Sequence, residues 1–254
     1  MKGEIFLEMR GIEKSFGSNK VLHGIDLDIH RGETLVLLGG SGGGKSVLMK
    51  HMTGLLQPDR GTVTLEGKLI SGLPERELAW ARRKVSMMFQ SGALFDSMTA
   101  AENIAFPLFE AGIKDRDEIE KRVKEALEIV KLSGQEDKMP SDLSGGMRKR
   151  VALARAVVEK PCCVLYDEPH AGLDPVTGNS IDHLIKALAH EHGITNVVIT
   201  HEIRSVFRIA DRVVFLKDGL IYFEGTPDEL KASKDPVLVA FIEGRAKGDW
   251  LEDG

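Results

Sequence analysis

The chain has 254 residues, of which 42% are hydrophobic, and its formal net charge at pH 7 is -5. A chain of this length and composition buries one sizeable core, and its acidic balance argues against a general affinity for nucleic acid. Two local basic clusters, at 82–84 and 148–150, are expected to be solvated helix faces. The two cysteines, Cys162 and Cys163, are adjacent in an apolar run, so they form neither a disulfide framework nor a metal-ligand spacing and suit a reducing compartment.

The apolar runs are of strand length and are far shorter than the ~20 residues that cross a bilayer. The first residues include Lys2 and Glu4 and do not form the apolar stretch of a signal peptide. We therefore expect that, if this protein works at a membrane, another chain holds it there.

Residues 1–90 alternate short apolar segments with turns, which is typical of strands. The pattern predicts a strand-rich lobe around a phosphate-binding unit. The expected strands are 5–9, 21–29, 34–38, 61–65 and 85–89, and the expected helices are 45–54 and 74–83.

A glycine-rich loop follows the strand expected at 34–38. Residues 39–46 read Gly-Gly-Ser-Gly-Gly-Gly-Lys-Ser, which matches the phosphate-loop pattern G-x-x-x-x-G-K-[ST]. Glycine suits this loop because polyphosphate must lie against successive backbone N–H groups. In this pattern the lysine reaches the β- and γ-phosphates and the serine hydroxyl binds Mg²⁺. We expect a nucleoside triphosphate to bind through Gly39, Gly40, Ser41, Gly42, Gly43, Gly44, Lys45 and Ser46.

Between residues 91 and 160 the hydrophobic period becomes helical. Thr99 and Glu102 have the spacing of a capping box. Residues 118–130 carry an amphipathic pattern, and we expect a helical lobe. Its predicted buried positions in that stretch are Ile119, Val123, Leu127 and Val130.

A second anion-binding device lies at the start of a later helix. Residues 143–147 read Leu143-Ser144-Gly145-Gly146-Met147, and Ser144 is a natural N-cap. The segment also fits an ordinary helix start with flexible glycines. However, the glycines leave a helix N-terminus bare, which attracts anions. One nucleotide does not need two such devices, so the simplest explanation is that this one serves a nucleotide held by another copy of the chain.

After residue 160 strands and helices alternate, which implies parallel strands with right-handed crossovers. We expect strands at 162–166, 196–200 and 212–216, and helices at 175–192 and 203–210. Residues 226–254 predict one or two short helices and a polar end with Trp250.

The strand expected at 162–166 runs into Asp167 and Glu168. A carboxylate at the end of a buried strand beside a phosphate loop is placed to hold Mg²⁺, and the second can accept a proton from an attacking water. The alternative is an acidic turn before Pro169 without such a role.

The order of these motifs resembles the ATP-binding subunits of ABC transporters over nearly the whole chain: the phosphate loop, Gln90, residues 143–146, 167–168, 173–174 and His201. The resemblance implies an α/β fold, a P-loop NTPase with a RecA-like core, an antiparallel β lobe and an inserted α-helical lobe. It further implies ATP hydrolysis with Mg²⁺ in a head-to-tail homodimer. The expected division is core and β lobe at 1–90 and 161–225, helical lobe at 91–160, and a C-terminal helical tail at 226–254.

The resemblance also implies roles for single residues. Gln90 senses the γ-phosphate and Mg²⁺, Asp174 communicates across the dimer, and His201 contacts the γ-phosphate and organises Glu168. Phe16 stacks on adenine. Three of these have plain alternatives: a strand-end histidine, an unremarkable glutamine and a core phenylalanine. The expected catalytic residues are Glu168, His201 and Lys45, and the expected Mg²⁺ residues are Ser46, Gln90 and Asp167.

The chain departs from the common family pattern at Gly40, Val47 and Met147, where proline, a hydroxyl residue and glutamine are frequent. Lys45 and Ser46 remain, so nucleotide binding is expected to survive. Val47 stays among the expected ATP contacts but lacks a hydroxyl for the α-phosphate, a bond worth about 1 kcal/mol.

Residues 91–108 and the two motifs at 143–147 and 167–175 are similar to the ATPases of Mla-type, MCE-associated phospholipid transporters. His170 departs from this pattern, in which we expect a larger apolar ring. The resemblance implies an integral permease that docks near 91–108, an MCE-type lipid-binding protein, and a location at the cytoplasmic side of the inner membrane. Leu94, Phe95 and Met98 fit either this docking groove or the lobe's own core.

Three other interpretations are weaker. A soluble ABC ATPase of iron–sulfur cluster assembly has similar motifs but matches residues 91–108 less well. A module that binds ATP without hydrolysis does not need Glu168 and His201. A DNA-repair ABC ATPase would carry a long coiled-coil insertion, for which the helical lobe leaves too little chain.

Overall fold

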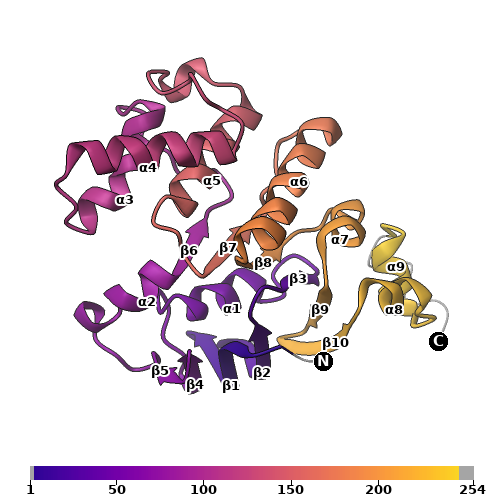
Figure 1. Ribbon diagram of the computed structural model, residues 1–254. Helices are drawn as coiled ribbons and strands as arrows, with labels where there is room; N and C mark the ends of the chain where they lie inside the picture. Colours follow the sequence, from indigo (N-terminus) through magenta and orange to yellow (C-terminus); the bar gives the residue numbers. More distant parts are fainter. Residues whose placement is uncertain (1–2, 246–254) are drawn as a thin grey trace.

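A computed structural model describes residues 3–245 (Figure 1). A six-stranded sheet runs through the molecule in the order β10-β9-β3-β8-β7-β6, parallel except for β10, which pairs antiparallel with β9. The expected α/β core is therefore confirmed. Its strands are β3 Thr34–Gly39, β6 Val85–Met88, β7 Cys163–Asp167, β8 Thr195–Ile199, β9 Arg212–Lys217 and β10 Leu220–Gly225.

The central strands are buried on both faces, which explains their continuous apolar runs. In β3, Leu35 and Leu37 face one hydrophobic core, whereas Val36 and Leu38 face another. This alternation follows from the two-residue period of a strand. The sheet thus separates two hydrophobic cores. Polar side chains lie at the edge where its parallel strands end.

One core lies between the six-stranded sheet and a second, antiparallel sheet of order β2-β1-β4-β5. The first two strands form a long hairpin around a turn at 17–18, so they are longer than the sequence predicted. The prediction ended each strand where polar residues begin. An antiparallel sheet needs only one apolar face, so its strands can continue through such residues. Its strands are β1 Ile5–Phe16, β2 Asn19–His30, β4 Arg60–Leu65 and β5 Lys68–Leu69.

Helices cover the other core, and Figure 1 shows α3, α4 and α5 grouped together, away from β1, β2 and β4. The capping box of Thr99 and Glu102 is confirmed, as is the N-cap of Ser144. The helices of the first 160 residues are α1 Lys45–Met52, α2 Ala79–Lys84, α3 Ala100–Glu110, α4 Arg116–Ile129 and α5 Gly145–Val157, with single 3-10 turns at Glu75–Glu77 and Pro140–Asp142.

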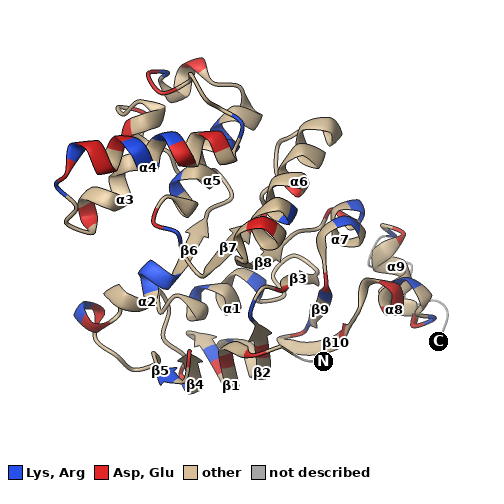
Figure 2. Ribbon diagram, in the orientation of Figure 1, with Lys and Arg blue, Asp and Glu red and all other residues tan. Residues whose placement is uncertain are grey.

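The amphipathic pattern of α4 is confirmed, since Ile119, Val123 and Leu127 are buried. Its outer face carries alternating charges (Figure 2), with Glu118 paired to Arg122 one turn later. The later helices are α6 Pro175–His192, α7 Ile203–Ile209, α8 Pro227–Ala232 and α9 Pro236–Ile242.

Two expectations need correction. The basic run 148–150 was expected to be a solvated helix face, but Lys149 is only 6% exposed because it points toward the carbonyl of Gln90. The strand β10 was not expected, although its residues are mostly apolar and follow the turn sequence Asp218-Gly219, which is typical of a hairpin. Trp250 lies outside the described residues. Within residues 3–245 no helix is both long and apolar enough to span a membrane.

Candidate active site

The phosphate loop connects β3 to α1, and the glycines at its two ends, Gly39 and Gly44, are required by space as well as by conformation. Gly39 has φ +140°, and a Cβ there would overlap the carbonyl oxygen of Leu216. Gly44, with φ +90°, lies directly before α1, where a Cβ would stand 2.8 Å from Leu22 Cδ2. The N-terminus of α1 therefore opens toward the loop with its free N–H groups, which suit a phosphate.

Lys45 lies over this loop. Its Nζ donates to the carbonyl oxygens of Gly39 at 2.8 Å and Gly40 at 2.9 Å. Burial lowers the pKa of Lys45, while the charges of Glu168 and Asp167 oppose that shift. The cation is thus held at the loop with hydrogen bonds that a phosphate oxygen can replace.

Ser46 and Asp167 meet across the sheet edge, where Ser46 Oγ donates to Asp167 Oδ1 at 3.2 Å. Burial raises the pKa of Asp167; the bond from Ser46 opposes this, and the charge of Glu168 adds to it. A hydroxyl and a carboxylate are the ligands that Mg²⁺ accepts. The pair fits the magnesium position expected from the sequence, and Mg²⁺ bound there supplies charge neutralisation for the phosphates.

Glu168 has an unusual backbone and an unsatisfied oxygen. Its φ is +49°, a left-handed conformation that is uncommon outside glycine. Its Oε2 lies 2.8 Å from His201 Nδ1, yet this buried oxygen has no hydrogen bond of acceptable geometry among the described residues. The two side chains are therefore close, but the His201 nitrogen is not aligned for a hydrogen bond to this oxygen. The oxygen can instead accept a hydrogen bond from a water.

His201 follows β8, and its side chain is 74% exposed, whereas that of Glu168 is 16% exposed. The two are brought together because β7 and β8 are adjacent parallel strands that end at the same edge. This proximity favours the expected pairing over an isolated strand-end histidine.

The remaining expected nucleotide residues lie around this centre in different environments. Phe16 is 50% exposed at the end of β1, so the alternative of a core phenylalanine is wrong. Gln90 is exposed just after β6. Val47 is half-buried on α1 and packs against the core between the two sheets.

The signature segment 143–147 is built as a helix start. Ser144 Oγ accepts a hydrogen bond from the N–H of Met147 at 3.2 Å. Gly146 lies so close to α6 that a Cβ there would overlap Cγ2 of Thr177. No hydrogen bond or ion pair in the described part of the chain joins this segment to the phosphate loop. Asp174 caps α6, accepting from the N–H groups of Val176 and Thr177.

A match to the ABC transporter family covers residues 22–171, more than half of the chain. The chain belongs to the ABC transporter family. This ABC ATPase therefore binds ATP with Mg²⁺ and hydrolyses it, as the phosphate loop and the Ser46–Asp167 pair require.

Three relatives align with this ABC ATPase over most of its length. It is 37% identical to the protein TRIGALACTOSYLDIACYLGLYCEROL 3 of Arabidopsis thaliana, over 96% of the chain and 75% of that protein. It is 40% identical to the probable ribonucleotide transport ATP-binding protein mkl of Mycobacterium leprae, over 96% of the chain and 70% of that protein. It is 43% identical to the methionine import ATP-binding protein MetN of Brucella abortus, over 93% of the chain but 64% of that protein.

Solved structures share the fold. The ATP-binding cassette MJ0796, solved as a dimer bound to ADP and Pi, is 34% identical with a TM-score of 0.80, covering 87% of this chain and 98% of that one. The cbiO1 protein of Clostridium perfringens, part of the ABC transporter complex cbiONQ, is 31% identical with a TM-score of 0.84, covering 93% and 94%. These likenesses confirm the P-loop NTPase fold.

The sequence did not point to two cations on α5 that hold the segment after Gln90. Lys149 Nζ donates to the Gln90 carbonyl, and Arg155 donates to the carbonyls of Gly92 at 2.7 Å and Ala93 at 2.8 Å. Burial lowers the pKa of both cations. No local pattern marked them, because residues six apart do not share one face of a helix and their partners lie in a distant segment of the chain.

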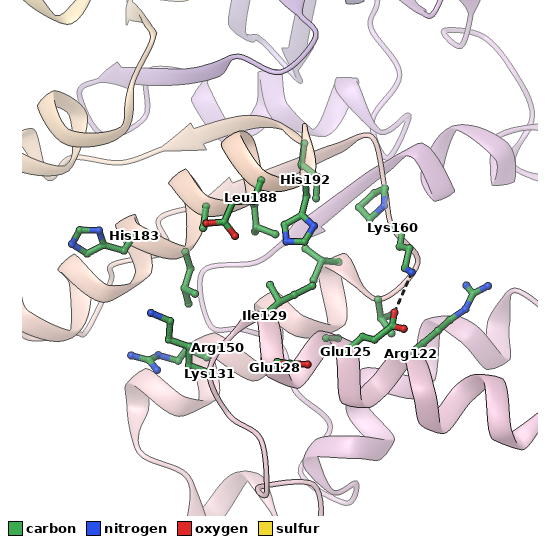
Figure 3. A pocket seen from close by; sticks show the side chains of 18 of the residues that line it. Arg122, Glu125, Glu128, Ile129, Lys131, Arg150, Lys160, His183, Leu188 and His192 are labelled. Atoms are coloured by element: carbon green, nitrogen blue, oxygen red, sulfur yellow. Dashed lines mark ion pairs between the residues drawn. The ribbon is translucent and has the colours of Figure 1, made fainter.

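A cavity of about 810 Å³ lies elsewhere, between α4 and α5 on one side and α6 on the other (Figure 3). Ile129 and Leu188 line it, and Lys160 pairs with Glu125 at its rim. None of the expected nucleotide residues lines it. In the phosphate loop itself, Ser41 and Gly42 are exposed, whereas Gly39 and Gly44 at its two ends are buried.

Proposed function

We propose that this ABC ATPase drives phospholipid transport between bacterial membranes. In this proposal two copies act with an integral permease and an MCE-type lipid-binding protein at the cytoplasmic face of the inner membrane. The similarity of residues 91–108 to Mla-type ATPases supports the lipid assignment, as does a relative named after a galactolipid.

The observation that carries the permease contact is the exposure of aromatic side chains within and beside the segment 91–108. Phe89, Phe95 and Phe109 are 40%, 42% and 56% exposed, whereas Leu94 packs into the core. Phe95 rests on Phe106 with ring centroids 4.8 Å apart. Such a surface suits an apolar helix of the permease.

We further propose that residues 1–90 and 161–225 form the RecA-like core and β lobe, 91–160 the helical lobe, and 226–254 the tail. In this arrangement the phosphate loop of one copy faces Ser144 of the other, since no hydrogen bond or ion pair among residues 3–245 joins the N-terminus of α5 to the phosphate loop of its own chain. The dimeric state of the similar cassette MJ0796 supports this arrangement.

Within that site each residue has one task. Lys45 and the loop N–H groups hold the phosphates, while Ser46, Asp167 and Gln90 are the proposed Mg²⁺ residues. The free oxygen of Glu168 accepts a proton from the attacking water, and His201 orients that water beside the γ-phosphate.

The test is reconstitution with the permease and the lipid-binding protein in liposomes. We expect ATP-dependent transfer of a labelled phospholipid, and no uptake of methionine or ribonucleotide. Uptake of either of those solutes, or purification from membranes with a soluble iron–sulfur scaffold in place of a permease, would contradict the proposal.

A matched pair of variants tests the docking surface. Phe95→Glu is expected to abolish co-purification of the permease while ATP binding persists. Leu69→Glu changes an equally exposed side chain on β5 and should leave co-purification intact. Equal permease recovery with both variants would place the contact elsewhere.

A further inference from the structure

His170 is a buried polar side chain in the turn between β7 and α6, two residues after Glu168. Its side chain is 10% exposed, and its Nε2 lies 2.7 Å from Asp182 Oδ1 on α6. The ring lies against the backbone of α6, since a Cβ at Gly178 would be 3.6 Å from His170 Cδ2. A histidine held this closely has a fixed orientation.

The partners of Asp182 determine which atom of the ring carries the proton. Asp182 accepts from Ser205 Oγ at 2.6 Å and from the guanidinium of Arg208, both on α7. Burial alone would raise the pKa of Asp182, but the bonds from His170, Ser205 and Arg208 hold it below its usual range. Asp182 is therefore a carboxylate, its charge is balanced by Arg208, and the Nε2 of His170 faces it as a donor.

The other ring nitrogen faces the segment that carries His201. In the tautomer that carries its proton on Nε2, Nδ1 is an acceptor, and Thr200 Oγ1 lies 3.4 Å from it. The same hydroxyl accepts from the N–H of Glu202 at 3.0 Å, so it donates toward Nδ1. His170 thus joins the turn after Glu168 to both residues that flank His201.

Packing alone does not fix the orientation of Glu168 and His201. Glu168 has a left-handed backbone that its surroundings must maintain, and His201 is largely exposed. One backbone bond, from Glu168 N–H to Ile199 oxygen at 2.9 Å, joins the two strand ends. The His170–Thr200 contact is a side-chain link that joins the same two segments.

We propose that His170 is a positioning residue for ATP hydrolysis. Its Nε2–H anchors the ring to Asp182, and its Nδ1 holds Thr200 so that His201 and Glu168 keep their mutual orientation. The inference rests on the roles proposed for Glu168 and His201, and it adds a residue that contacts neither phosphate nor water.

The experiment compares steady-state ATP hydrolysis and ATP binding in His170→Phe, His170→Gln and Thr200→Val. Phenylalanine keeps the ring but loses both nitrogens. Glutamine keeps an amide donor in reach of Asp182, and so preserves the fold, but lacks an acceptor at the Nδ1 position. Each variant is expected to lower kcat about tenfold with KM and ATP affinity changed less than about twofold.

Three comparisons separate positioning from a general loss of structure. The double variant His170→Phe with Thr200→Val should lose no more than either single variant, because both remove the same contact. Thr200→Ser keeps the hydroxyl and should restore kcat. His183→Phe, an exposed position on α6, should leave kcat unchanged.

A kcat within twofold of the parent in folded His170→Gln overturns the inference, as do additive losses in the double variant or a parallel loss of ATP affinity. Glu168→Gln distinguishes this failure from failure of the proposed site. If Glu168→Gln remains active, the site assignment is wrong; if only the His170 variants remain active, this inference alone is wrong.

Discussion

At the residue scale, Glu168 combines a left-handed backbone, with φ +49°, and a buried carboxylate oxygen. Among the described residues, six other than glycine have positive φ. Of these only Glu168 also has a buried side-chain oxygen without an aligned hydrogen-bond donor, although His201 Nδ1 lies 2.8 Å away. Strain and an unsatisfied acceptor beside a phosphate loop therefore favour a role in the reaction.

Replacement of Glu168 by glutamine should separate binding from hydrolysis. The amide keeps the size of the side chain but accepts no proton, so we expect kcat to fall about 100-fold or more, with ATP affinity retained and an ATP-bound dimer trapped. Hydrolysis assays and size-exclusion chromatography with ATP measure both effects. Glu202→Gln, at an exposed carboxylate nearby, is the control. Undiminished turnover in Glu168→Gln would refute the assignment as base.

At the scale of elements, the contact between α5 and α6 depends on a missing side chain. A Cβ at Gly146 would overlap Thr177 Cγ2, whereas a Cβ at Gly145 would stand 3.7 Å from Leu173 Cδ2, an ordinary contact. Thr177 in turn donates its N–H to Asp174, the N-cap of α6. The start of α5, which carries the segment 143–147, and the start of α6 at Asp174 are thus held in a fixed relative position.

Gly146→Ala should push α5 from α6 and lower the free energy of unfolding by about 1–3 kcal/mol, as overpacking does. Urea denaturation measures this. Gly145→Ala is the matched control and should cost less. Adding Thr177→Ser removes the overlapping methyl group but keeps the hydroxyl, so the double variant should regain most of the loss. Equal effects of the two alanine variants would argue against the close contact.

At the scale of the whole molecule, the starts of α1 and α5 are two glycine-rich helix N-termini that no hydrogen bond or ion pair joins in the described part of the chain. If each ATP is shared by two chains, a homodimer of Lys45→Ala has two defective phosphate loops, and one of Ser144→Arg has two blocked signature helices. In the mixed dimer both defects fall on one site and the other site is intact.

Mixing the two inactive variants should therefore restore part of the ATPase activity. The expected recovery is about a quarter of the parent rate, since half of the dimers are mixed and each has one intact site. ATPase titration of one variant with the other measures it. No recovery, with mixed dimers shown to form, would mean that each chain completes its own site.

The motif residues were predictable from sequence because their chemistry is local. The loop 39–46, Asp167, Glu168 and the cap of Ser144 each follow from neighbours a few residues away. The burial of Lys149 and His170 was not predictable. In the sequence, Lys149 lies in a basic run and His170 in a turn, and both contexts usually indicate solvent-exposed side chains. The strand β10, by contrast, was predictable, since Asp218-Gly219 is a hairpin turn sequence between two apolar runs, but the prediction ended at residue 216.

The sequence by itself determined the fold class, the nucleotide and the family, since short-range patterns of glycine, capping residues and apolar period encode them. Only the tertiary structure decided which side chains meet. Asp167 reaches Ser46 and Glu168 approaches His201, because parallel strands bring their carboxyl ends to one edge. His170 meets Asp182 because α6 folds back along the turn that precedes it. Contacts between residues far apart in the chain depend on strand order and packing, which no local pattern specifies.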